Sequence, residues 1–258
     1  MNIVLMHGVL GFGAVTPPLP QYFSGVADHL RSKTGASVLV TGVPPIGQIK
    51  ARAAAAARQI KSGIDRGDLA SPFHIIAHSM GGLDARCIAS LDLEQLRAGI
   101  KSIVCLGTPH FGSPVASLLD AANPFEPFLS AVAPHAPIIE RFRQHTDAAH
   151  DLSEVAAATF NHECPDVADV RYLNVAGAGR QSGAHTSAFF QPTFLFLVAQ
   201  GCGQNDGVVP FASATRGQAP FQTWPGDHAD LIGHDLDRPF DAPSAEHLAR
   251  YERLAAQL

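Results

Sequence analysis

The sequence predicts an α/β fold with a mostly parallel central sheet that is covered by helices on both faces. Short apolar runs of strand length recur along the chain and alternate with longer segments of helical character. The apolar runs are continuous, which is typical of strands buried on both faces of a parallel sheet. With 258 residues, 46% hydrophobic and 16% charged, the chain is long enough for one large domain.

The expected elements follow one another in order. Apolar runs predict strands at residues 3–6, 38–40, 73–77, 101–106, 170–175, 194–199 and 221–224. Helices are expected at residues 22–33, 46–64, directly after residue 82, and at 244–258, where Ser244 is the predicted N-cap. The alanine-rich core of the second helix is interpreted as a surface for close packing against the sheet.

Residues 120–165 interrupt this alternation. Prolines punctuate an apolar stretch there, with helical segments expected at 138–145 and 152–160. An apolar helical insertion after a functional loop favours a substrate-binding cap or lid, the alternative being an ordinary surface subdomain. No linker or internal repeat is visible, so residues 1–258 are expected to form a single domain with this insertion.

Composition excludes several classes of protein. A net charge of −5 without a dense Lys/Arg run argues against nucleic acid as the main partner. No uninterrupted apolar stretch reaches the length of a transmembrane helix. No secretory signal is visible, so a cytoplasmic location is expected, unless a signal has been removed from a secreted protein.

The four cysteines do not suggest a disulfide framework in a chain of this length. Cys87 and Cys105 lie in apolar segments and are expected to be buried. Pairing of Cys164 with Cys202 stays open. The absence of C-x-x-C spacing argues against a zinc site.

One serine occupies a distinctive position. The apolar run at 73–77 leads into His78-Ser79-Met80-Gly81-Gly82 and then a helical segment. A strand, a sharp turn with a central serine and a helix form the context of a nucleophile elbow, whose flanking residues must be small. Here they are Ala77 and Gly81. The alternative is an ordinary turn.

A serine nucleophile needs a histidine base that is held by a carboxylate. If the serine belongs to an α/β hydrolase, these partners follow it at the ends of later strands. That order favours Asp206, after the predicted 194–199 strand, although Asp-Gly is also a common turn signal. His228 follows the predicted last strand and is the preferred base. His234 stays an alternative, and His247 is expected on the surface of the final helix.

A glycine-rich loop at residues 7–13 follows the first strand. Such a loop can direct a backbone N–H toward an oxyanion. The loops that begin at His7, Ser79 and Thr108 all follow predicted strands, so they are expected at the carboxyl edge of the sheet, where functional loops gather.

Five ordered segments resemble motifs of the bacterial triacylglycerol lipase and esterase family of the α/β-hydrolase superfamily: HGVLGF (7–12), AHSMGG (77–82), GTPHFGS (107–113), GQNDGVV (203–209) and HAD (228–230). The resemblance implies an α/β-hydrolase fold and ester cleavage by Ser79, Asp206 and His228. It also implies an oxyanion hole formed by the backbone N–H groups of Val9 and Met80. His78 and His110 match positions that look supporting rather than catalytic.

Two departures from the family pattern stand out. Ala77 replaces the first elbow glycine, which is similar to small lipases without a large lid, although this chain retains its insertion. Many secreted members bind a structural calcium ion through a residue that matches Asp230. No Asp or Glu lies between Arg171 and Asn205, where a second acidic ligand is expected. The missing ligand argues against a structural calcium ion without excluding it, and no other cofactor is expected.

The predicted function is hydrolysis of carboxylic esters, with the apolar insertion and Phe189-Phe190 favouring a hydrophobic substrate. Transient contact with a lipid interface is compatible with this prediction. Alternatives are a polyester (polyhydroxyalkanoate) depolymerase or a thioesterase with the same triad, and a catalytically silent binding protein of the same fold. Acyl length, alcohol and oligomeric state stay open.

Overall fold

The computed structural model describes residues 1–9, 21–118, 146–179, 186–238 and 242–258. In this part of the chain, parallel strands form one sheet in the order β2-β1-β3-β4-β5-β6. The strands are β1 (Asn2–Met6), β2 (Ser37–Val40), β3 (Phe73–His78), β4 (Ile100–Leu106), β5 (Arg171–Ala178) and β6 (Gln222–Pro225).

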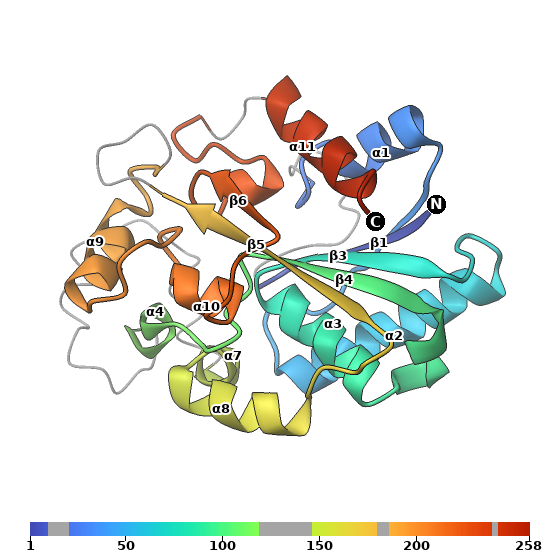
Figure 1. Ribbon diagram of the computed structural model, residues 1–258, viewed down its shortest axis with the longest axis horizontal. Coiled ribbons are helices and arrows are strands. Elements are labelled where there is room, and N and C mark those ends of the chain that lie inside the picture. Colours follow the sequence, from blue (N-terminus) through green and yellow to red (C-terminus); the bar gives the residue numbers. More distant parts are fainter. Residues whose placement is uncertain (10–20, 119–145, 180–185, 239–241) are drawn as a thin grey trace.

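Helices connect the strands and cover both faces of the sheet (Figure 1). They are α1 (Val26–Thr34), α2 (Ile49–Asp65), α3 (Met80–Ser90), α4 (Pro114–Leu118), α7 (Thr146–Asp151), α8 (Glu154–Glu163), α9 (Gln191–Ala199), α10 (Phe211–Thr215) and α11 (Ala245–Ala255). Short 3-10 turns lie at Leu93–Gln95, Arg97–Gly99 and Asp230–Ile232. Within the described residues, no helix combines the length and apolar character needed to cross a membrane.

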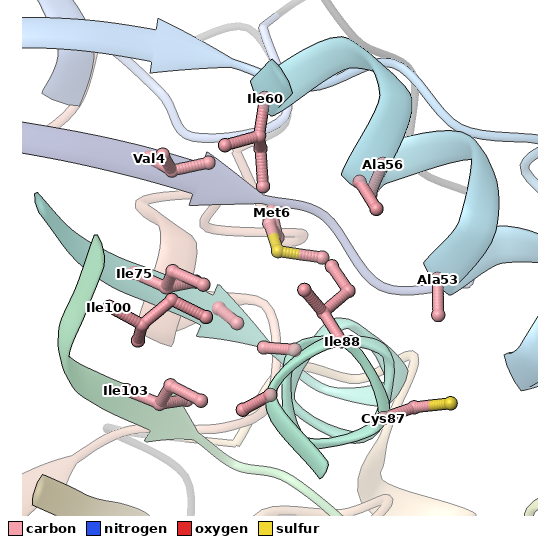
Figure 2. Packing of buried hydrophobic residues seen from close by; sticks show 14 of the residues in the cluster. Val4, Met6, Ala53, Ala56, Ile60, Ile75, Cys87, Ile88, Ile100 and Ile103 are labelled. Carbon is pink, nitrogen blue, oxygen red and sulfur yellow. The ribbon is translucent and has the colours of Figure 1, made fainter. Parts of the chain in front are cut away.

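Two hydrophobic clusters hold the layers together. Val4 and Met6 of β1 pack with α2 and α3 on one face of the sheet, as Figure 2 shows. Ile3 and Leu5 of the same strand pack with α1 and α11 on the other face. Successive strand side chains point to opposite faces, so a strand covered on both sides must be apolar throughout. The predicted α/β class is therefore confirmed.

The strand predicted at 194–199 is wrong, because these residues belong to α9. A short apolar run cannot be assigned to strand or helix by periodicity alone, and Pro192 in the first turn suits a helix start. Phe194 and Leu197, three residues apart, are buried, whereas Leu195 and Val198 are exposed on the helix.

Of the remaining predicted elements, some lie within the described residues and can be compared with the structure, and others lie outside them. Ser244 caps α11, since its Oγ accepts a hydrogen bond from the His247 N–H at 3.1 Å. α8 covers the helix predicted at 152–160. The helix predicted at 138–145 lies outside the described residues, so the lid stays a prediction.

All four cysteines are free thiols, which answers the open pairing of Cys164 with Cys202.

Candidate active site

Ser79 joins β3 to α3 in an unusual backbone conformation. Its φ of 55° and ψ of −131° lie in a region that residues other than glycine rarely adopt, and such strain is common at functional sites. The Ser79 N–H donates to the Leu106 carbonyl at 2.8 Å, and the Ser79 carbonyl accepts from the Gly82 N–H at 3.0 Å. The turn is thus fixed from both sides, between the end of β4 and the first turn of α3.

Close backbone approach explains the glycines around this serine. A Cβ on Gly81 would lie 2.7 Å from the Met6 carbonyl oxygen, and a Cβ on Gly8 would lie 2.6 Å from Ser79 Cβ. The elbow therefore packs directly on the end of β1. Ala77 belongs to β3 rather than to the turn, and it is fully buried, so a methyl group fits there without a left-handed backbone.

Asp206 and His228 form a tight pair. The His228 Nδ1–H donates to Asp206 Oδ2 at 2.7 Å, and the His228 backbone N–H donates to the Asp206 carbonyl at 2.9 Å. The other carboxylate oxygen accepts from the N–H groups of Val208 and Val209 at 2.9 and 2.6 Å. Because Nδ1 carries the proton, Nε2 of His228 is left as an acceptor.

This pair lies at the same sheet edge as the serine. A Cβ on Gly107 would be 3.0 Å from Asp206 Oδ2 and 3.3 Å from His228 Nδ1, and Gly107 directly follows the residue that holds the Ser79 N–H. The ring of His78, the neighbour of Ser79, lies 4.4 Å from the His228 ring between centroids. The Asp206–His228 pair, from loops after α9 and β6, therefore lies beside the turn that carries Ser79.

The other two candidate histidines lie elsewhere. His234 Nε2 lies 2.9 Å from the carbonyl oxygens of both Gln21 and Tyr22. His247 is only 4% exposed, so its expected surface position is wrong: it lies on the face of α11 that packs inward, 5.1 Å from the Tyr251 ring. Burial lowers the pKa of His247 to about 4.

A buried arginine organises the loop after β1. Arg52 Nη2 donates to the carbonyls of His7 and Gly8 at 2.8 and 3.3 Å, and its guanidinium pairs with Asp84 at 2.8 Å. The side chains of Arg52 and Asp84 are both fully buried. The peptide between Gly8 and Val9 is planar, so fixing the Gly8 carbonyl also fixes the direction of the Val9 N–H.

His7 supports the same carbonyl. The Val43 N–H donates to His7 Nε2 at 3.1 Å, which places the ring proton on Nδ1, 2.8 Å from the Gly8 oxygen. Burial lowers the pKa of His7 to about 4, so the ring stays neutral at neutral pH. Residues 10–13 of the predicted loop lie outside the described residues.

Tyr22 links this loop to the elbow. Its hydroxyl accepts from the Gly8 N–H at 3.1 Å and lies 2.7 Å from His78 Nδ1, to which it can donate. Burial, aided by the nearby His228, lowers the pKa of His78 well below its ordinary value. A neutral His78 thus connects the strand that carries the serine to the loop after β1.

Sequence reasoning missed Arg52 and Tyr22. Arg52 lies in the alanine-rich helix, which is interpreted from the sequence only as a packing surface. The sequence does hold one indication of its burial, since Arg52 lies on the same helix face as the alanines at 53 and 56, which are buried. Tyr22 carries no motif. Its role depends on contacts with residues 14 and 56 positions away, which a local pattern does not contain.

Asp230, which the resemblance matches to a calcium ligand, accepts a hydrogen bond from the backbone. Asp230 Oδ2 accepts from the Asp227 N–H at 2.8 Å, and Asp227 accepts from the N–H groups of Ser187, Ala229 and Asp230. Burial raises the pKa of Asp230 to about 7. Within the part of the chain that the structure describes, no group of three His, Cys, Asp or Glu side chains could hold a metal ion.

Comparison with known proteins finds lipases among the relatives of this chain. No protein-family model matches the chain. Triacylglycerol lipase 2 of Saccharomyces cerevisiae is 37% identical over 216 residues, which cover 82% of this chain and 62% of that protein. Triacylglycerol lipase of Pseudomonas fragi is 27% identical and covers 90% of this chain and 87% of its own. The solved structure of a mature Bacillus licheniformis lipase aligns with a TM-score of 0.68 at 21% identity, over 90% of this chain and 86% of that one.

Proposed function

Because the chain belongs to the lipase and esterase family of the α/β-hydrolase fold, we propose that it is a serine hydrolase that cleaves carboxylic esters through an acyl-enzyme. The observation that carries this proposal is the 2.7 Å hydrogen bond between His228 Nδ1 and Asp206 Oδ2, at the sheet edge where Ser79 occupies its strained turn.

In the proposed reaction, Nε2 of His228 takes the Ser79 proton as Oγ attacks the ester carbonyl. Asp206 holds the imidazole in the tautomer with the proton on Nδ1 and stabilises the imidazolium that forms. His228 then gives its proton to the leaving alcohol, and the Ser79–acyl bond replaces the ester bond. Water repeats the cycle from the other side and releases the acid. No step uses a metal or an organic cofactor.

The developing oxyanion is proposed to accept hydrogen bonds from the N–H groups of Val9 and Met80. Met80 is the first residue of α3, whose N-terminal dipole also favours a negative charge. The loss of one such donor costs about 2.7–4 kcal/mol in the barrier. In this scheme Arg52 acts as a positioning residue, since it reaches the oxyanion only through the Gly8–Val9 peptide.

A hydrophobic ester is the proposed substrate class. Apolar side chains gather on and beside α9, where Phe189, Leu195 and Val198 are 44%, 40% and 39% exposed. α9 precedes the Asp206 loop, and the Phe190 ring lies 6.4 Å from the His228 ring between centroids. Exposed apolar surface next to the proposed base favours an acyl chain or a lipid interface over a polar substrate.

The proposal is tested with a panel of nitrophenyl esters of increasing acyl length, alongside a thioester and a polyhydroxyalkanoate. Ser79→Ala should lower kcat by about four to six orders of magnitude while leaving the thermal unfolding curve unchanged. Ser32→Ala, which alters an exposed serine of α1, serves as the matched control. Ester turnover that survives in Ser79→Ala would rule out Ser79 as the nucleophile.

A further inference from the structure

A second pocket, outside the proposed active site, lies between α8, β5 and the end of α10. Its volume is about 520 Å³. The pocket is lined by Asn161 of α8, Tyr172 and Asn174 of β5, and by Phe111, Asp166, Arg216 and Gln218. None of these residues belongs to the proposed triad or oxyanion hole, so the pocket needs its own explanation.

A chain of buried hydrogen bonds fixes which atoms Asn174 offers to this pocket. Arg86 Nη1 lies 3.3 Å from His110 Nδ1, and a guanidinium can only donate, so Nδ1 accepts and the ring proton is on Nε2. That Nε2–H lies 3.1 Å from Asn174 Oδ1 and donates to it. Burial and the neighbouring Arg86 lower the pKa of His110 well below its ordinary value, which keeps the ring neutral. The amide NH₂ of Asn174 is thus left for the pocket.

The charges beside the pocket do not cancel. Asp166 accepts from Arg86 Nε at 3.1 Å and also from Arg216 Nη1, so two guanidinium groups share one carboxylate. Arg86 is fully buried, and its remaining N–H groups donate to Asn161 Oδ1 at 2.9 Å and to the Cys164 carbonyl at 3.2 Å. The Arg216 side chain is 23% exposed and lines the pocket. Asp166 and Arg216 both line the pocket and pair with each other, while the fully buried Arg86 pairs with the same carboxylate, so the three groups together carry a net charge of +1.

Two aromatic residues complete the lining. The Tyr172 hydroxyl accepts from the Val167 N–H at 3.2 Å, and within the described residues its own proton meets no acceptor. Phe111, 46% exposed, contributes an apolar wall. The lining thus combines hydrogen-bond donors of three residues and an apolar ring with the paired Asp166 and Arg216, and buried Arg86 gives that cluster a net charge of +1.

We propose that this pocket binds a small carboxylate through Arg216, Asn174 and Tyr172. The planar guanidinium of Arg216 matches a carboxylate, and the net charge of +1 on Arg86, Arg216 and Asp166 together balances a monoanion. A phosphate dianion would bring excess negative charge close to Asp166. The inference concerns binding alone and does not depend on the reaction proposed at Ser79. The ligand is either the acid that hydrolysis releases or an unrelated acid, and both share this chemistry.

The test is a ligand-observed NMR titration of the full chain with butyrate, with butyramide as the neutral match and inorganic phosphate as the dianion. Butyrate should bind saturably and more tightly than both. Arg216→Gln and Asn174→Asp should each weaken butyrate at least about tenfold, since each removes or opposes a charge-assisted hydrogen bond. Arg58→Gln, which removes the same charge from an exposed position on α2, should leave the affinity unchanged.

Several results would overturn the inference. Absence of saturable butyrate binding would do so, as would equal binding of butyramide or phosphate, or an affinity that Arg216→Gln and Asn174→Asp do not change. Thermal unfolding of each variant shows whether it folds, and each of the two substitutions tests the site separately. A titration with acids of increasing length then identifies the source: preference for the acid of the best ester substrate assigns the pocket to the product, and any other preference assigns it to an unrelated acid.

Discussion

At the scale of single residues, the ion pair of Arg52 and Asp84 has two separate effects. It is fully buried, so removing one partner strands the other charge in the core. Burial raises the pKa of Asp84 to about 7, and the adjacent guanidinium opposes that rise. Arg52 also holds the carbonyls of His7 and Gly8. Stability and the geometry of the proposed oxyanion hole therefore depend on the same side chain, and mutation can separate the two.

Arg52→Met is expected to lower the free energy of unfolding by about 3–5 kcal/mol, because Asp84 loses its counter-charge. It should also lower kcat by about 10²–10³, as for the loss of an oxyanion donor. Arg52→Met with Asp84→Leu should regain most of the stability but not kcat. Urea unfolding and ester kinetics on the same preparations measure both. Recovery of kcat in the double variant would mean that Arg52 does not position the Val9 N–H.

At the scale of elements, the first turn of α3 depends on its contact with the end of β1. A methyl group on Gly81 would approach the carbonyl oxygens of Met6 and His7 to 2.7 and 2.8 Å. These are backbone atoms at the end of β1 and of the residue that follows it, so they cannot move aside without displacing the elbow.

Gly81→Ala is therefore expected to lower kcat by at least about tenfold and to destabilise the fold by about 1–3 kcal/mol. Gly47→Ala is the matched control, because its Cβ would meet Arg52 Cγ at an ordinary 3.7 Å. Thermal unfolding and ester turnover compare the two. Equal behaviour of the two variants would contradict the tight packing of α3 on β1.

At the scale of the whole molecule, buried neutral histidines link stability to pH. Burial lowers the pKa of both His7 and His247 from 6.5 to about 4. Between about pH 6.5 and pH 4, these two histidines are therefore protonated in the unfolded chain but neutral in the folded chain. The stability that these side chains contribute is complete above about pH 6.5 and is lost as the pH falls toward 4. Asp230, whose pKa is raised to about 7, acts in the opposite direction.

A substitution isolates one histidine from these opposing effects. As the pH falls from about 6.5 toward 4, His247→Leu should gain stability relative to the wild type by up to about 1.4 kcal/mol per pH unit. Urea unfolding of both proteins across this range measures the difference. A constant difference would show that His247 is not held neutral by burial.

The sequence predicts those elements that local patterns determine, and it fails for those that depend on contacts between distant residues. Strands buried on both faces are continuous apolar runs, so the strands of the described sheet could be located. The run at 194–199 has the same local pattern but forms α9, because the choice is made by tertiary packing of Phe194 and Leu197. His247 is buried by contacts with Tyr251 and its neighbours on α11, and no local pattern contains the sheet that α11 covers.

The candidate site likewise contains residues that local motifs predict and residues that only distant contacts reveal. Ser79, Asp206 and His228 lie in short motifs at strand or turn ends, and the motifs alone select them as candidates. The position after the predicted last strand favours His228 over His234, and only the folded chain shows the 2.7 Å contact of His228 with Asp206, which joins residues on separate loops. Arg52 and Tyr22 act on the backbone of distant residues, so only the folded chain identifies them.

The proposed reaction depends most on the activation of Ser79 by His228. Labelling with a fluorophosphonate, followed by mass spectrometry of the peptides, measures this directly. The wild type should carry the label on Ser79, Ser79→Ala should stay unlabelled, and His228→Gln should be labelled at least about a hundredfold more slowly. Label on another residue, or labelling in His228→Gln at the wild-type rate, would contradict the account.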